Sequence, residues 1–119
     1  MKNYSIINNL IGEQLSSVEF VQDYLQLHFD GKDLTLYIWP TVQVKNELYD
    51  IYHIEFRNWL CSLISLIVVD VFLVEKTELI ILFPDNQAIK VNLSQNNPDI
   101  ISEIGIFNDT IKNEWLVFE

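Results

Sequence analysis

Alternation of apolar with polar or aromatic residues around one short turn constrains this chain more than any other feature. Leu25, Leu27 and Phe29 occupy every second position before the turn at 30–33. Residues 34–38 show the same alternation after it. A period of two is that of a β-strand, and Asp-Gly is a preferred hairpin turn. The pattern therefore predicts an antiparallel hairpin whose aliphatic and phenyl side chains share one core face.

A second part of the chain follows a similar plan. Three further strands are expected between turn-forming residues, at 67–74, 79–83 and 88–93. The first half offers a matching trio, because Val18 and Phe20 mark a short strand ahead of the hairpin. Both halves place a Phe and then an Asp-containing turn after the second strand. This likeness indicates two related three-stranded meanders, with chance similarity as the alternative.

Between the two halves, residues 50–66 have the spacing of an amphipathic helix. Apolar residues recur there at three- and four-residue steps: Tyr52, Phe56, Trp59, Leu60, Leu63 and Ile64. Asp50 is the predicted N-cap. Residues 99–107 are read as a short helix or an irregular covering segment, and 115–118 as a last strand. The predicted fold class is α+β, one domain of residues 1–119. Its largely antiparallel sheet has five to seven strands, in one arrangement two three-stranded meanders, packed on one central helix.

Charge restricts the partners of such a domain. The chain carries 17 acidic and 7 basic residues, a net charge of -10, on a sequence that is 50% hydrophobic. That much apolar content predicts a folded core with an acidic surface. An acidic surface repels nucleic acid and membrane headgroups and attracts basic proteins. The most apolar window, 60–69, is far shorter than the ~20 residues of a membrane span. The start lacks the apolar run of a signal peptide, so we expect a cytoplasmic protein.

Sequence motifs for catalysis are lacking. The three glycines, Gly12, Gly31 and Gly105, lie far apart and form no phosphate-binding loop. The two histidines, 25 residues apart, show no metal-ligand spacing. The lone cysteine, Cys61, lies in an apolar stretch, where we expect a buried thiol. We therefore expect no enzyme activity, no cofactor and no metal.

One candidate binding surface lies on the non-core side of the hairpin. His28 shares that side with Tyr24, Tyr37 and Trp39 in the alternating pattern. Tyr and Trp combine a large apolar area with a polar group, as interface hot spots do. Alternatively, another segment such as the terminal strand covers these side chains.

A second candidate surface lies near the end of the chain. Its acidic residues are Asp99, Glu103, Asp109 and Glu114, and Trp115 lies among them. Carboxylates steer a basic partner and an aromatic ring anchors it, although a solvated acidic face is the simpler interpretation. Asp70 interrupts an apolar strand, either as an edge charge that blocks strand pairing or as an anion for a partner.

The first 40 residues resemble a family of small bacterial proteins. The resemblance rests on four stretches: residues 11–15, Val18-Glu19-Phe20-Val21 with Asp23-Tyr24-Leu25-Gln26-Leu27, the Phe29-Asp30-Gly31 turn, and Trp39-Pro40. Some members of this kind are similar to immunity proteins, which neutralise toxins of contact-dependent growth inhibition or other polymorphic systems. The resemblance implies a bacterial cytoplasmic partner protein without catalysis, and it assigns no functional residue.

Three hypotheses of function follow. The leading one is an immunity-type inhibitor, a monomer or weak dimer, whose acidic surface neutralises a cognate basic toxin domain such as a nuclease. The alternative is a non-catalytic structural or regulatory homo-oligomer that associates through the aromatic side of the hairpin. The third is a small enzyme built on His28 and a carboxylate, which lacks the convergent groups that acid–base catalysis needs.

Overall fold

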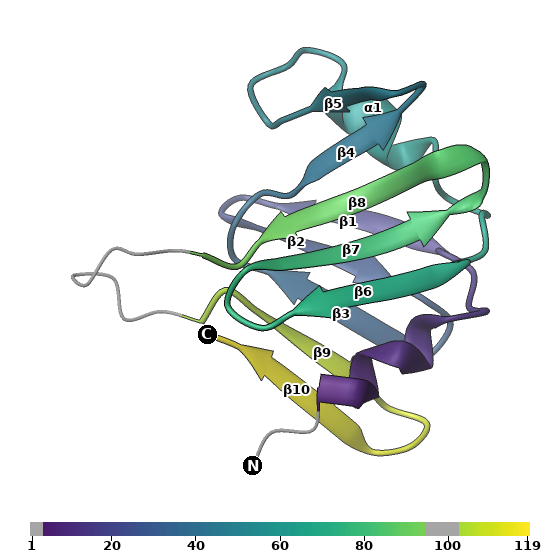
Figure 1. The fold of residues 1–119 in the computed structure, drawn as a ribbon, viewed down its shortest axis with the longest axis vertical. Coiled ribbons are helices and arrows are strands. Elements are labelled where there is room, and N and C mark those ends of the chain that lie inside the picture. Colours follow the sequence, from purple (N-terminus) through teal and green to yellow (C-terminus); the bar gives the residue numbers. More distant parts are fainter. Residues whose placement is uncertain (1–3, 95–102) are drawn as a thin grey trace.

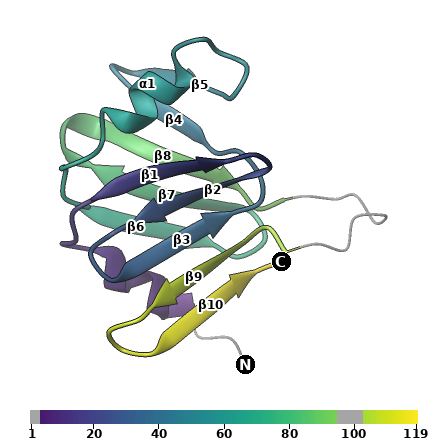
Figure 2. The same ribbon diagram turned by 180° about the vertical axis from the view of Figure 1, so that it is seen from behind.

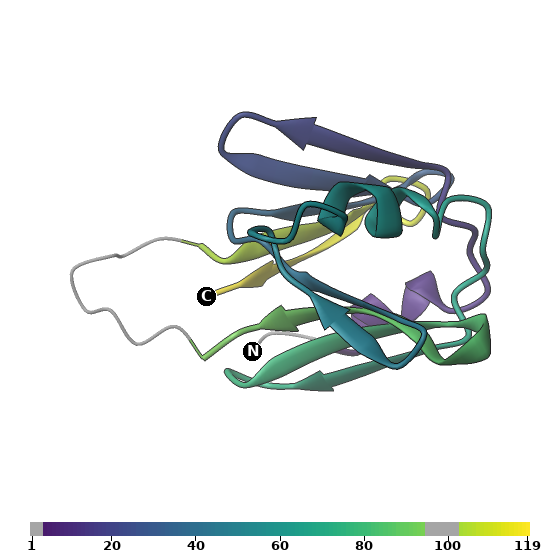
Figure 3. The same ribbon diagram turned by 90° about the horizontal axis from the view of Figure 1, so that it is seen from above.

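The computed structural model describes residues 4–94 and 103–119, which form ten strands in two antiparallel sheets (Figure 1). The first sheet contains, in spatial order, β1 (Ser17–Val21), β2 (Tyr24–His28), β3 (Lys32–Leu36), β9 (Gly105–Asp109) and β10 (Glu114–Phe118). The second sheet contains β5 (Glu47–Tyr49), β4 (Thr41–Val44), β8 (Gln87–Asn92), β7 (Glu78–Phe83) and β6 (Asp70–Val74). The two sheets are stacked as layers, with the core between them (Figure 3).

The chain is an α+β protein built largely of antiparallel sheet, as its sequence predicts. The sheet count differs, because five strands in each of two sheets replace the single sheet of five to seven. Part of the difference is the β4–β5 hairpin, where Val42 and Val44 alternate with polar residues. Lys45 and Asn46 join these strands with φ angles of 55° and 64°, the left-handed pair that a tight hairpin turn requires. The other additional strand is β9, which lies where the sequence predicted a short helix or an irregular segment.

Two three-stranded meanders are present, one in each sheet. Strands β1-β2-β3 are consecutive neighbours in the first sheet and β6-β7-β8 in the second. Each meander is followed by a hairpin that crosses to the other sheet, so β4 pairs with β8 and β9 pairs with β3. The fold is therefore a twofold repeat of meander and hairpin, in which the halves exchange hairpins (Figures 1 and 2).

The turns after the second strand of each meander are also alike. Asp30 and Gly31 have φ angles of 48° and 92°, and Asp85 and Asn86 have 60° and 59°. Asp, Asn and Gly tolerate this left-handed region better than other residues. The likeness seen in the sequence between the two Asp-containing turns is thus a likeness of backbone conformation.

The core is made of the inward-facing residues of both sheets. Leu25, Leu27 and Phe29 are fully buried, as are Leu34 and Leu36 across the hairpin. Ile38, which the pattern placed with them, is half-buried and packs against the same core. The second sheet contributes the side chains that face them: Val42, Val44, Val71, Leu79, Ile81, Phe83, Ile89 and Val91.

The predicted helix at 50–66 is largely wrong, because α1 spans only Phe56–Cys61. The Asp50 carboxylate accepts a hydrogen bond from the N–H of Tyr52 at 3.0 Å, and its carbonyl accepts one from the N–H of His53 at 3.0 Å. These local bonds hold residues 50–55 in turns instead of a helix. Asp50 is therefore not the N-cap; Glu55 holds that position.

Both helical segments close open sides between the sheets. The α1 helix contacts β1 and β4, one strand from each sheet, so it lies at the rim of the layers and not at the centre. On the opposite side, the 3₁₀ helix η1 (Tyr4–Leu10) contacts β6 and β10, again one from each sheet (Figure 1). Without these segments, the apolar interior would meet water at both rims. Among residues 4–94 and 103–119, no helix is long and apolar enough to cross a membrane.

A matched pair of substitutions tests the shortened helix. Phe56 is fully buried in α1, so Phe56→Ala should lower the free energy of unfolding by about 3–5 kcal/mol. Tyr52, which the periodicity assigned to the same buried stripe, is 93% exposed. Tyr52→Ala should change that free energy by less than about 0.5 kcal/mol. Urea unfolding of both variants measures the difference, and a comparable loss in both would support the longer helix.

Candidate docking surface on the first sheet

The outer face of the first sheet is fixed by the register of its strands. Its side chains alternate with the buried ones: Ser17, Glu19, Val21, Tyr24, Gln26, His28, Asp33, Thr35, Tyr37, Ile106, Asn108, Trp115 and Val117. No Lys or Arg occupies any of these positions. This set is here called the acidic face, and the sheet that carries it is in front in Figure 2.

His28 lies between two carboxylates on the acidic face. Its Nδ1 is 2.6 Å from Asp33 Oδ1, and its Nε2 is 3.1 Å from Glu19 Oε1. Asp33 is the direct cross-strand neighbour on β3, whereas Glu19 reaches His28 diagonally from β1. The hydrogen bond to Asp33 raises the pKa of His28 above its ordinary 6.5; burial opposes this, and Glu19 adds to the rise.

Three of the predicted aromatic residues reach the outer surface of this sheet: Tyr37 and Trp115, which are exposed, and Tyr24, which is half-buried. Tyr24 and Tyr37 lie 6.0 Å apart between ring centroids, and Tyr37 is 43% exposed. Trp115, on the edge strand β10, is 64% exposed. The terminal strand does not cover the hairpin, because it lies beyond β9 in the same sheet. The structure therefore brings Tyr24, His28, Tyr37 and Trp115 to one solvent-facing surface.

Trp39 is not part of the acidic face. It follows β3, where the chain crosses to the second sheet, and stacks on Phe20 at 6.5 Å between ring centroids. It also lines a hollow of about 450 Å³, together with Leu48 and Lys90 of the second sheet. Although β3 ends at Leu36, the expected alternation continues through Tyr37 and Ile38 and fails at Trp39, which packs against the core as Ile38 does.

The acidic residues near the end of the chain do not form one surface. Asp109 is fully buried, which contradicts its assignment to a partner-binding surface. Glu114 is half-buried and accepts a hydrogen bond from Asn9 Nδ2 at 3.1 Å. Glu103 is exposed, and Asp99 lies outside the described residues.

Asp109 instead organises a buried polar cluster. Its carboxylate accepts hydrogen bonds from the N–H groups of Ile111 and Lys112 and from Asn9 Nδ2, each at 3.0 Å. It also faces Lys32 across the β3–β9 pair, and Lys32 Nζ lies 3.4 Å from Glu13 Oε1. Burial alone raises the pKa of Asp109, but the hydrogen bonds and the Lys32 charge outweigh it and lower that pKa. Asp109 thus stabilises the fold and ties η1 to the first sheet.

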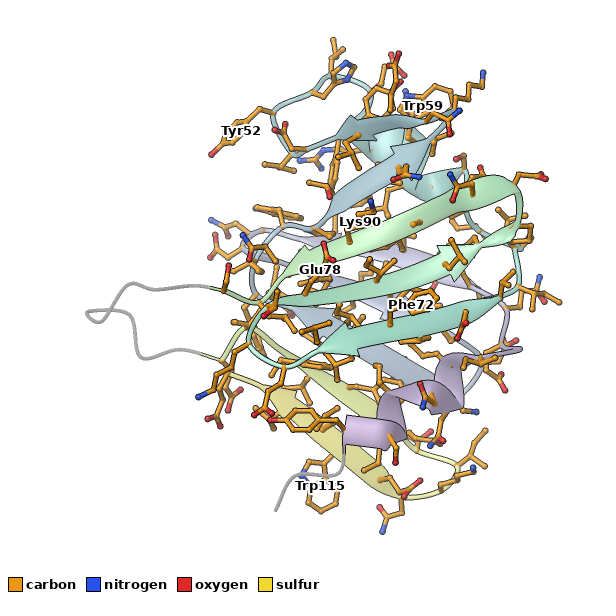
Figure 4. The ribbon with its side chains drawn as sticks, viewed as in Figure 1. Tyr52, Trp59, Phe72, Glu78, Lys90 and Trp115 are labelled. Carbon is orange, nitrogen blue, oxygen red and sulfur yellow. The ribbon has the colours of Figure 1, made fainter. Side chains whose placement is uncertain are left out.

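The projecting loop 50–55 is an apolar surface that the sequence did not predict. Tyr52 and Ile54 are 93% and 90% exposed, and Tyr52 points away from the body in Figure 4. The signal was present in Asp50, which favours turns, and in two β-branched isoleucines, which disfavour helix. Cys61, expected to be buried, is exposed as well.

These features define an acidic protein of two stacked antiparallel sheets with a carboxylate- and aromatic-bearing outer face. Within the described ranges, no three His, Cys, Asp or Glu side chains converge as metal ligands do. The chain matches no known protein family, and comparison with curated proteins and with solved structures also finds no match.

Titration of His28 tests the geometry of the acidic face. Because the folded-state pKa exceeds 6.5, protonated His28 stabilises the fold below that pH. The contribution disappears as the pH rises through the folded-state value. Proton NMR of the ring should show the raised pKa, and Asp33→Asn should lower it more than Glu19→Gln. Equal effects of the two substitutions would show that the Asp33 contact does not dominate.

Substitution of Asp109 tests its structural role. Asp109→Ala leaves buried donors without an acceptor and should lower the free energy of unfolding by about 1–3 kcal/mol. Glu103→Ala, in the same acidic stretch but exposed, should change it by less than about 0.5 kcal/mol. Urea unfolding at neutral pH compares them. The charge-dependent part of the Asp109 contribution should be lost as the pH falls through the lowered folded-state pKa, so the gap between the two variants should narrow in acid.

Proposed function

We propose that this chain is an immunity-type inhibitor that binds and neutralises a cognate basic toxin domain, such as a nuclease. The acidic face supports this proposal most. It carries Glu19 and Asp33 beside Tyr24, Tyr37 and Trp115, and none of its positions holds a Lys or Arg.

The chemistry of the face suits a cationic protein. A nuclease cleft lined with Lys and Arg to hold phosphates offers the opposite charge to Glu19 and Asp33. Carboxylates accelerate encounter with such a cleft, and the rings of Tyr37 and Trp115 offer apolar anchors with polar groups. The net charge of -10 favours the same partner over nucleic acid or an anionic membrane surface.

In this proposal the chain catalyses no reaction and binds no cofactor. His28 is engaged by Asp33 and Glu19 and tunes the local charge: the three groups together carry -1 when His28 is protonated and -2 when it is neutral. Toxin neutralisation by this route takes place in the bacterial cytoplasm, where the cognate toxin would act.

The experiment measures association with the product of the neighbouring gene, where a cognate toxin would be encoded. Glu19→Gln combined with Asp33→Asn should slow association roughly tenfold at low salt. Glu55→Gln combined with Asp85→Asn makes the same change in net charge at exposed positions away from the face. This control pair should leave the rate close to that of the wild type.

A second measurement distinguishes the aromatic side chains, which slow dissociation of the complex, from the carboxylates, which speed its association. Tyr37→Ala and Trp115→Ala should each speed dissociation about 30-fold, the effect of a loss of about 2 kcal/mol. Rising salt should slow association of the wild type while leaving dissociation nearly unchanged. Absence of binding, or equal effects of the face and control pairs, would refute the proposal.

A further inference from the structure

The outer face of the second sheet is apolar where that of the first is acidic. Phe72 and Val74 on the edge strand β6 are 49% and 58% exposed, and Ile80 and Leu82 lie beside them on β7. Contiguous exposed apolar side chains of this kind mark a surface that another molecule covers.

Three charged residues lie on this face: Lys90, Glu78, and Asp70 at the start of β6. Ile80 stands between Phe72 and Lys90 in one cross-strand row, and Glu78 stands in the next row, diagonal to Lys90. Figure 4 shows Phe72, Glu78 and Lys90 on the same side of the sheet. Within the described part of the chain, neither Lys90 nor Glu78 makes an ion pair.

We infer that a second copy of this chain covers the face and forms a twofold-symmetric dimer. Symmetry demands that if one residue meets another across the interface, the reverse contact also forms. An axis in the plane of the interface that passes between Lys90 and Glu78 meets this demand. It places each Lys90 opposite the Glu78 of the other copy.

The same axis also brings the apolar side chains of the two copies into contact. Because Phe72 and Ile80 lie in the row that leads to Lys90, the axis passes close to both of them. Each then packs near its own counterpart, which buries the apolar row beside the two ion pairs. Asp70 lies on the edge strand β6, in the row on the other side of Phe72 from Glu78. Its carboxylate accepts the hydrogen bond of the Val71 N–H at 2.8 Å.

Charge argues for a second copy over a cationic partner at this face. Lys90 lies in the central row, so a Lys- or Arg-rich surface would bring like charges together there. The outer faces of the two stacked sheets point in opposite directions (Figure 3). A dimer formed through the second sheet therefore leaves both acidic faces open, and the inference does not depend on the proposed toxin partner.

Reversal of the two charges tests the pairing. Sedimentation of the full chain at about 100 µM should show the dimer, and Lys90→Glu and Glu78→Lys should each weaken it at least tenfold. Each variant alone places like charges opposite one another. An equimolar mixture of the two variants should restore the dimer, because the two glutamates on the face of one chain then meet the two lysines on the face of the other. The double variant should dimerise as well.

Two controls complete the experiment. Phe72→Asp should abolish the dimer while thermal unfolding stays close to that of the wild type, because the side chain is half exposed. Trp115→Ala, on the acidic face, should leave the dimer intact. A wild-type monomer at this concentration would overturn the inference, as would single variants that dimerise normally or a mixture that stays monomeric.

Discussion

Burial of alternate residues from both sheets in one core is the constraint on which the rest of this structure depends. Each strand has a period of two, so inward Leu25 and Leu27 require Tyr24, Gln26 and His28 to face outward. A slip of one residue in any strand would exchange the two sets. The chemistry of both outer faces is therefore set by the same register that forms the core.

One place in the core is polar, and it fixes a pairing that hydrophobic burial alone leaves open. Lys32 and Asp109 form the last inward row of β3 and β9, strands that lie far apart in the sequence. Apolar residues pack acceptably in several registers, but a buried carboxylate needs its donors. The Ile111 and Lys112 N–H groups supply two donors from the turn that follows β9. Asn9 and the charge of Lys32 meet the rest of the need, and their positions depend on how η1 and β3 are placed. The same contacts hold η1 over the open side of the layers, so one cluster aligns the sheet and closes the core.

Local patterns were readable from the sequence, and long-range pairings were not. The hairpin around Asp30 and Gly31 was predictable because alternation and turn chemistry agree there. The helix at 50–66 was overestimated because its buried residues, Phe56, Leu60 and Leu63, have helical spacing without a helix of that length. Asp50 and His53 bind nearby backbone groups instead. The exchange of hairpins between sheets joins β3 to β9 and β4 to β8, and no local pattern specifies such partners. Consequently Tyr24, His28 and Tyr37 were found together from one hairpin, whereas buried Asp109 was mistaken for a surface acid.

The two outer faces occupy equivalent positions of a repeated fold, yet they differ in what each can bind. On the acidic face, Glu19 and Asp33 have no Lys or Arg at any neighbouring outer position. Two copies that met there would bring four carboxylates together, with only the two His28 rings of the same face to offset them. On the second face, Lys90 and Glu78 are self-complementary, and the exposed apolar side chains of Phe72 and Val74 lie beside them. A chain with a net charge of -10 resists meeting its own copy. It can do so most readily where an opposite pair such as Lys90 and Glu78 offsets the repulsion. The distribution of seven basic residues, more than the acidic excess itself, therefore decides which face suits a second copy and which suits a cationic protein.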